Sequence, residues 1–188
     1  MKDIKKKILL QREKKNEGLK HTSFEMETST HFPMLIKTVQ MTTGTVLEIG
    51  SGIFSTPLLH WLCYGQKRMV ITIEHYKHYL DFASKFKSEW HQVLYRDPKE
   101  IMQFEVPEDR ISVVFIDHSP KRPRTRGDDA LLFKDIADFV VLHDAGVDGH
   151  KKYGYDQLYS QFKYRYDWTG CMPHTTVLSN FIDVSKWN

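Results

Sequence analysis

The feature that most constrains the fold of this chain is a regular alternation of short, β-branched apolar runs with longer amphipathic stretches. Short runs of this kind suit strands that are buried on both faces, whereas the stretches between them have helical periodicity. Five runs are expected to be strands: 45–49, 69–73, 92–95, 111–116 and 139–142. A strand followed by a helix, repeated along the chain, is typical of a parallel sheet that helices cover on both sides.

The remaining elements complete this sheet. The expected helices begin after the hydroxyl residues 28–30, with Pro33 in the first turn, and lie at 55–64, 76–90 and 155–166. The last helix should lead into a sixth strand, and a final strand is expected at 175–184. We therefore predict an α/β fold with a doubly wound, mostly parallel, seven-stranded sheet. Ligands of such a sheet bind at the carboxyl ends of its strands.

Length and composition indicate one domain that needs no disulfide framework. The chain has 188 residues, and its two cysteines, Cys63 and Cys171, are expected to be free thiols. Residues 31–188 should form the domain, preceded by a basic lead-in over 1–30 that could fold over a ligand as a lid. Neither a secretory signal nor a membrane span is recognised in the sequence, so the expected location is the cytoplasm.

Acidic residues stand at or next to the ends of all five of the first strands. They are Glu48, Glu74, Asp97, Asp117 and Asp144. A single acid in such a place usually caps a turn or a helix. Because the carboxyl ends of parallel strands meet at one edge of the sheet, five acids together predict a shared ligand site.

A glycine-rich turn follows the first of these strands. Gly50 and Gly52 allow the backbone to pass close to a ligand, and Ser51, Ser55 and Thr56 offer hydroxyl groups at the start of the next helix. A dinucleotide-binding turn would need a third glycine at position 55, where serine stands. The pattern therefore argues against a nicotinamide-dependent oxidoreductase.

The run Glu48-Ile49-Gly50-Ser51-Gly52 resembles the first motif of class I S-adenosylmethionine-dependent methyltransferases. The resemblance extends over residues 45–184. It implies that the glycines pass beneath the amino-acid part of the cofactor, that Glu48 lies near its ammonium group and that Glu74 binds its ribose. Asp97 would lie near the adenine amino group. The cofactor-binding residues expected from it are Glu48, Gly50, Ser51, Gly52, Ser55, Thr56, Glu74, His75, Asp97 and Asp117. The reaction would leave S-adenosylhomocysteine as the product.

Methyl transfer to a hydroxyl group needs a residue that removes a proton. The candidates are Asp117 and His118 after the fourth strand, and His143 and Asp144 after the fifth. Histidine is suited to this role because its pKa lies near neutrality. We expect His118 or His143 to act as the base, assisted by its neighbouring aspartate. Inert histidines that only bond the backbone are the competing interpretation.

The sequence contains part of a known ligand set for a divalent metal ion. Methyltransferases of the catechol type hold such an ion with an aspartate after strand four and an Asp-Asn pair after strand five. Asp117 and Asp144 match two of these positions, but Ala145 stands in place of the asparagine. The set is incomplete, so a metal ion is not expected to be required.

The methyl acceptor is expected to be a small molecule or a sugar. The basic segment 121–126 after the fourth strand could bind an anionic group on it. A nucleic-acid methyltransferase is the alternative, suggested by this segment and by residues 1–20, which hold eight Lys or Arg and three acids. Against it, the Asn/Asp-Pro-Pro-aromatic motif of amino methyltransferases is missing after the fourth strand. A protein that binds S-adenosylmethionine without catalysis is the third possibility.

Overall fold

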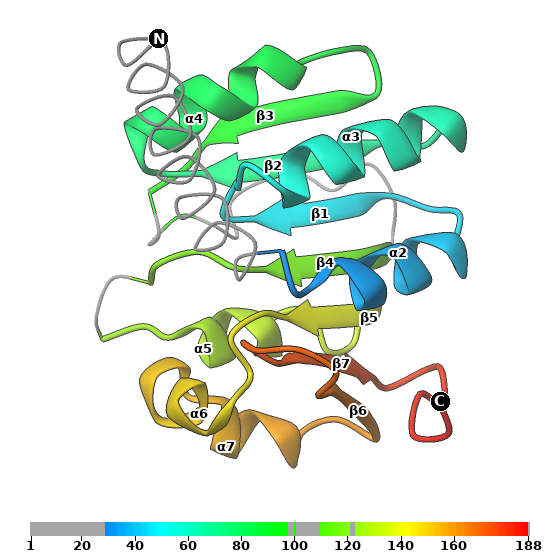
Figure 1. The fold of residues 1–188 in the computed structure, drawn as a ribbon, viewed down its shortest axis with the longest axis vertical. Helices are drawn as coiled ribbons and strands as arrows, with labels where there is room; N and C mark the ends of the chain where they lie inside the picture. Colours follow the sequence, from blue (N-terminus) through cyan, green and yellow to red (C-terminus); the bar gives the residue numbers. More distant parts are fainter. Residues whose placement is uncertain (1–28, 98–99, 101–109, 121–122, 188) are drawn as a thin grey trace, which may run out of the picture.

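A computed structural model of the chain has one seven-stranded sheet at its centre (Figure 1). It describes residues 29–97, 100, 110–120 and 123–187. The strands are β1 (Val46–Ile49), β2 (Val70–Glu74), β3 (His91–Tyr95), β4 (Ile111–Ile116), β5 (Ala137–Leu142), β6 (Tyr164–Trp168) and β7 (Thr175–Ser179). Their order across the sheet is β3-β2-β1-β4-β5-β7-β6. The first five are parallel, and β7 runs antiparallel to both β5 and β6.

Helices cover both faces of the sheet (Figure 1). They are α2 (Phe32–Gln40), α3 (Ser55–Gly65), α4 (Lys77–Ala83), α5 (Arg126–Leu131), α6 (Val147–Tyr153) and α7 (Tyr155–Tyr159), with a 3₁₀ turn at Ser84–Phe86 after α4. None of the described helices is long and apolar enough to cross a membrane.

Alternation along each strand divides the core into two layers. In β4, Val113 and Phe115 pack with α2 and α3 on one face, whereas Val114 and Ile116 pack with α5 and α7 on the other. Successive strand side chains point to opposite faces, and both faces of a doubly wound sheet are covered, so β4 is apolar throughout. This burial fixes the strand register and therefore the positions of the residues that follow each strand.

The predicted fold class and sheet are confirmed, and the differences are in the helices and in the last strand. The helix expected at 155–166 ends at Tyr159, and residues 164–168 form β6. Its aromatic residues alternate with polar ones, a period of two that suits pairing with β7. The helix expected at 76–90 ends at Ala83. The last strand stops at Ser179, whose Oγ accepts hydrogen bonds from the N–H groups of residues 181 and 182.

The start of the first described helix also differs from the expectation. Pro33 lies in its first turn as predicted, but His31 occupies the cap position and no side chain caps the helix. The hydroxyl of Thr30 instead donates to the carbonyl oxygen of Pro173, at 2.6 Å. Residues 1–28 of the basic lead-in and possible lid, and residues 121–122 of the basic segment, lie outside the described residues. The domain boundary near residue 30 therefore stays a prediction.

Candidate active site

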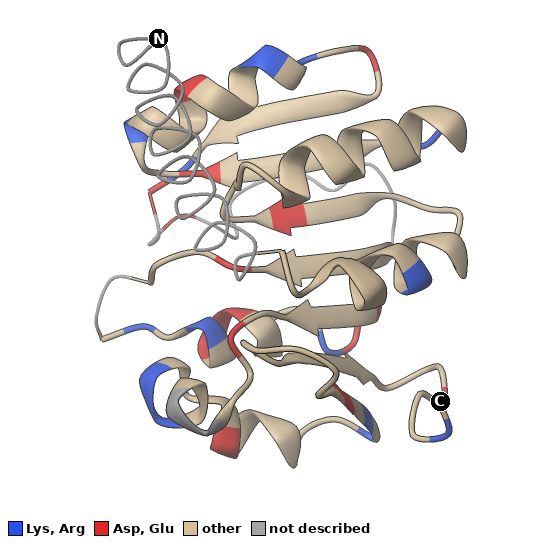
Figure 2. Ribbon diagram, viewed as in Figure 1, with Lys and Arg blue, Asp and Glu red and all other residues tan. Residues whose placement is uncertain are grey.

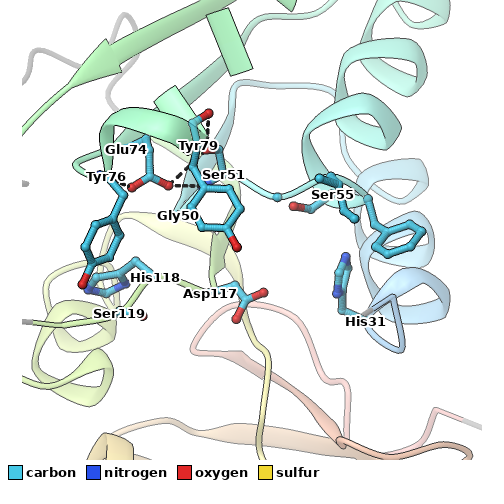
Figure 3. A pocket seen from close by; sticks show the side chains of 13 residues that line it. His31, Gly50, Ser51, Ser55, Glu74, Tyr76, Tyr79, Asp117, His118 and Ser119 are labelled. Carbon is cyan, nitrogen blue, oxygen red and sulfur yellow. Dashed lines mark hydrogen bonds between the residues drawn. The ribbon is translucent and has the colours of Figure 1, made fainter. Parts of the chain in front are cut away.

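A pocket of about 570 Å³ lies at the carboxyl ends of β1, β2 and β4 (Figure 3). Its size is in the range of small-molecule sites. Its lining is His31, Gly50, Ser51, Gly52, Ile53, Phe54, Ser55, Glu74, Tyr76, Tyr79, Asp117, His118 and Ser119. Figure 2 shows acidic residues at this end of β1 and β2 and in the loops after β4 and β5. Of the five acids predicted to share a ligand site, Glu74 and Asp117 line this pocket, whereas Glu48, Asp97 and Asp144 do not.

The glycine turn after β1 packs directly on the loop after β4. Gly50 has a φ of +91°, and a Cβ atom there would lie 2.5 Å from the backbone nitrogen of His118. The close approach places the β1 turn and the residues after β4 on adjoining walls of the pocket (Figure 3). Only glycine combines this φ with so short a contact.

Glu74, at the end of β2, accepts hydrogen bonds from both neighbouring turns. Its Oε2 accepts from the N–H and Oγ of Ser51, at 2.9 and 3.0 Å, as the dashed lines in Figure 3 mark. Its Oε1 accepts from the N–H groups of His75 and Tyr76, at 2.6 and 2.7 Å. Ser51 Oγ also lies 3.2 Å from the carbonyl oxygen of Tyr79, to which it can donate instead. Rotation of that hydroxyl would free an acceptor position on Glu74 for a ligand.

Glu48 lies beneath the glycine turn and does not line the pocket. Its side chain is fully buried and accepts hydrogen bonds from the hydroxyls of Thr56, at 3.0 and 3.1 Å, and of Thr72, at 2.7 Å. Thr56 Oγ in turn accepts from the N–H of Gly52, at 3.0 Å. Thr72 Oγ lies 2.8 Å from Nε2 of His91. Glu48 therefore supports the turn from below, through hydroxyl groups.

Replacement of Glu48 by Gln is expected to flatten the pH dependence of the unfolding free energy of the ligand-free protein. Burial raises the pKa of Glu48 from 4.5 to about 7, against the hydrogen bonds that it accepts. A carboxyl with a raised folded-state pKa is most favourable below its unfolded pKa. The wild type should therefore lose about 3 kcal/mol between pH 4.5 and 7, and no more of this contribution above pH 7. Glutamine stays neutral, so the Glu48→Gln variant should not show this loss.

Urea unfolding at a series of pH values measures this difference. Glu89→Gln, at an exposed position, is the matched control and should keep the wild-type profile. Profiles of the wild type and of Glu48→Gln that run parallel from pH 4.5 to 7 would contradict the raised pKa.

Four charged side chains form a cluster at the ends of β4 and β5. The guanidinium of Arg126 lies 3.1 Å from Asp117 Oδ1 and 3.1 Å from Asp144 Oδ2. His143 Nδ1 lies 3.2 Å from Asp117 Oδ2 and 3.6 Å from Asp144 Oδ1. Burial alone would raise the pKa of Asp117, but the charges of Arg126 and His143 outweigh it and lower the pKa to about 2. Asp117 is therefore ionised at neutral pH.

The hydrogen bonds around His143 indicate that both of its ring nitrogens carry protons. The Thr30 hydroxyl donates its proton to Pro173, so at 3.0 Å it accepts from His143 Nε2. Nδ1 faces the ionised Asp117, which can only accept. Burial would lower the pKa of His143, but Asp117 outweighs it and the pKa is raised. His143 is therefore an imidazolium with no free lone pair in this arrangement.

His118 pairs with Asp129 of α5, not with its sequence neighbour Asp117. Its Nε2 lies 2.8 Å from Asp129 Oδ2, and both side chains are almost fully buried. The angle departs from that of an ideal hydrogen bond, but a carboxylate oxygen this close favours the proton on Nε2. Nδ1 has no hydrogen-bond partner among the described residues. The other oxygen of Asp129 accepts from Arg124.

The structure brings seven of the predicted site residues into the pocket lining. They are Gly50, Ser51, Gly52, Ser55, Glu74, Asp117 and His118. The other predicted residues, Glu48, Thr56, His75, Asp97, His143 and Asp144, are not among the lining residues. Thr56 and Glu48 support the turn, and His143 and Asp144 lie in the charged cluster behind Asp117.

Several residues of the site were not predicted from the sequence. His31 lines the pocket, is 1% exposed, and neither ring nitrogen has a hydrogen-bond partner among the described residues. Burial and the neighbouring charge of His143 lower its pKa to about 3, so it is neutral. Tyr79 is 39% exposed and lines the pocket beside Tyr76. His31 carries no local signal, because α2 brings it to the strand ends only in the folded chain.

The predicted basic segment is also used differently. Arg126 is the first residue of α5 and is 3% exposed, and Arg124 pairs with Asp129. Its two described arginines are therefore engaged within the protein. Thr125 and Asp128 form a reciprocal capping box, and this spacing is a sequence signal from which a helix beginning at Arg126 could have been predicted.

The catechol-type metal ligand set does not fit the site. A metal ion bridging Asp117 and Asp144 would have to displace the guanidinium of Arg126, which bonds both carboxylates. Ligand atoms of His31, Asp117 and His143 lie within 4.8 Å of one another. However, His143 donates through both nitrogens, and both oxygens of Asp117 are paired. The guanidinium of Arg126 thus occupies the position between Asp117 and Asp144 that a metal ion would take.

The seven-stranded sheet, with its antiparallel β7 beside β5, has the fold of class I methyltransferases. A human methyltransferase 10 domain containing protein is similar over 82% of this chain and 84% of its own, with 12% identity and a TM-score of 0.59. An O-methyltransferase from Bacillus cereus in complex with SAH matches 81% of this chain and 80% of its own, at 15% identity and a TM-score of 0.55. The METTL16 MTase domain is similar over 80% of this chain and 66% of its own, with 12% identity and a TM-score of 0.57.

These identities show the fold alone. No family model matches the sequence, and no curated protein matches it either.

Proposed function

We propose that this chain is an S-adenosylmethionine-dependent methyltransferase that acts on a hydroxyl group of a small molecule or sugar. The observation that carries the proposal is the pocket between the Gly50 turn, Glu74 and Asp117 on a sheet of this fold. The B. cereus O-methyltransferase, a structure of the same fold, was solved with S-adenosylhomocysteine. The buried, unpartnered nitrogens of His31 further indicate a pocket in which a polar ligand completes the hydrogen bonding.

The carboxylate, the ribose and the adenine of the cofactor each have a candidate partner in the pocket. The amino-acid part would lie along the turn from Gly50 to Gly52, with its carboxylate toward Ser55 and the first turn of α3, which no side chain caps. The ribose would bind Glu74, once Ser51 Oγ turns to the carbonyl oxygen of Tyr79. The ring of Tyr76 offers a face for the adenine.

His118 is the best-placed general base. Asp129 favours the proton on Nε2, which leaves a lone pair on Nδ1, whereas His143 has no lone pair to accept a proton. His118 Nδ1 is buried in the structure, so the residues around it would have to move before His118 takes the proton of the acceptor hydroxyl as the oxygen attacks the methyl carbon. S-adenosylmethionine, when bound, supplies the methyl group, and the bond to sulfur breaks with its electron pair on sulfur. Asp117, which lines the same pocket, is ionised at neutral pH.

The His118→Gln variant is expected to lower the rate of methyl transfer by 10²- to 10⁴-fold, because the acceptor proton then leaves to water. The affinity for S-adenosylhomocysteine should change by less than about threefold. A transfer assay with radiolabelled S-adenosylmethionine and a panel of hydroxyl compounds, sugars and nucleic acids measures the first quantity. The control is His150→Gln, because His150 is a partly exposed histidine that pairs with Asp156. An unchanged transfer rate in His118→Gln would remove the assignment.

The same panel tests the reaction itself. Transfer to hydroxyl compounds or sugars supports the proposed function, and transfer to nucleic acids alone would replace it. The pairing of Arg124 and Arg126 with internal acids favours the first outcome, because these pairs reduce the positive charge that the segment offers to phosphates.

A further inference from the structure

Arg126 is a cation that the fold itself places at the ends of β4 and β5. The capping box at Thr125 and Asp128 starts α5 at this residue, and the side chain turns inward to 3% exposure. Its Nε donates to the carbonyl oxygen of His118 at 2.5 Å, and its guanidinium lies over the ring of Tyr153, with Cζ 3.9 Å from the centroid. The geometry of the guanidinium is therefore fixed from three sides.

The two carboxylates that Arg126 joins come from neighbouring parallel strands. Asp117 follows β4 and Asp144 follows β5, and each presents one oxygen to a different guanidinium nitrogen at 3.1 Å. Asp144 holds its carboxylate there with a φ of 56°, a conformation that aspartate tolerates better than most residues. A planar fork that bonds two carboxylates is a task for which arginine is better suited than lysine.

Charge balance explains why the cluster is stable when buried. Two carboxylates face one guanidinium and one imidazolium, so the formal charges of Arg126, His143, Asp117 and Asp144 cancel. A divalent ion added to this set would leave an excess of positive charge beside Arg126 and His143, whose side chains are only 4% exposed. Removal of Arg126 would instead leave two carboxylates with one imidazolium, so the cluster would carry a net negative charge.

We propose that Arg126 is a built-in substitute for a divalent metal ion: its guanidinium bridges Asp117 and Asp144, so the acceptor site is assembled without a metal. This inference rests on the proposed function. Arg126 is a positioning residue, because it acts through Asp117 and the backbone of His118. The acceptor would then be bound by hydrogen bonds, and chelation of adjacent hydroxyls by a metal would have no part in its recognition.

The test is a calorimetric titration of the full chain with Mn²⁺ and with Mg²⁺, with electron paramagnetic resonance of Mn²⁺ as a second readout. The wild type should show no saturable binding at millimolar metal. Arg126→Ala should melt at a lower temperature and bind Mn²⁺ at least tenfold more tightly than the wild type, because the two carboxylates become available. Methylguanidine at millimolar concentration should restore the melting temperature and compete with Mn²⁺.

Two further variants make the result specific. Arg124→Ala removes the other described arginine of the segment, which pairs with Asp129, and should not gain Mn²⁺ binding. Arg126→Ala combined with Asp144→Asn should lose the gain. If the Arg126→Ala protein does not fold, Arg126→Gln takes its place, because the glutamine amide can donate hydrogen bonds to the carboxylates but carries no charge.

Either of two results would overturn the inference. One is saturable Mn²⁺ binding by the wild type that Asp144→Asn abolishes. The other is a folded Arg126→Ala or Arg126→Gln protein that binds Mn²⁺ no better than the wild type. Neither measurement uses the cofactor. Loss of the proposed function would appear instead as absence of S-adenosylhomocysteine binding by the wild type.

Discussion

Replacement of Glu74 by Ala is expected to weaken the binding of S-adenosylmethionine and S-adenosylhomocysteine on the order of 100-fold. Glu74 is the acid at the end of β2, and its carboxylate lies in the pocket beside the turn after β1. Hydrogen bonds from ribose hydroxyls to a charged acceptor contribute about 1.5–3 kcal/mol each, so the loss of a pair amounts to about 3 kcal/mol or more. Calorimetric titration of the wild type and the variant measures the two affinities.

Ser51→Ala separates ribose binding from support of the turn. It removes the hydroxyl that bonds Glu74 but keeps the carboxylate and the bond from the Ser51 backbone N–H. We expect it to bind S-adenosylhomocysteine within a few-fold of the wild type. A Glu74→Ala protein that binds the cofactor as tightly as the wild type would remove the ribose assignment. Tighter binding of NAD than of S-adenosylhomocysteine by the wild type would overturn the proposed cofactor.

The parts of the site that could be predicted from the sequence are those that a strand end fixes locally. Gly50, Glu74 and His118 each follow or end a buried strand, so their place at one edge of the sheet follows once the strands are recognised. The register of a doubly covered sheet then leaves little freedom in how they meet. The expected helix over 155–166 failed for a related reason. Its aromatic residues fit both a helix and a strand, and pairing with β7 decided between the two.

The partners of these residues could not be predicted, because they come from elements that fold back from elsewhere in the chain. His118 was assigned its neighbour Asp117, but α5 brings Asp129 to it. Arg126 was expected, with the rest of the segment 121–126, to be able to bind an anionic group of the acceptor, but the carboxylates after β4 and β5 draw it inward. A basic segment gives the number of its charges but not their partners, and the partners decide whether it can bind a ligand.

Gly50→Ala is expected to have the largest effect on stability of the substitutions considered. Its φ of +91° costs a residue with a Cβ about 1–2 kcal/mol. The Cβ would also lie 2.5 and 2.6 Å from the backbone nitrogen and Cα of His118, so one of the two backbones must shift. Overpacking of this kind costs about 1–3 kcal/mol more. The sum is a large part of the stability of a domain, and the melting temperature should fall by roughly 10 °C.

Gly52→Ala is the matched control in the same turn. Its Cβ would meet only the Oγ of Ser55, at 3.1 Å, and that side chain can move. Thermal unfolding should place this variant within a few degrees of the wild type, and equal melting temperatures for both variants would contradict the close contact at Gly50. Because the backbone that an alanine at position 50 would displace belongs to Asp117 and His118, folded Gly50→Ala should also bind S-adenosylhomocysteine more weakly than Gly52→Ala. The contact that excludes a side chain at Gly50 thus also holds together the two walls of the pocket.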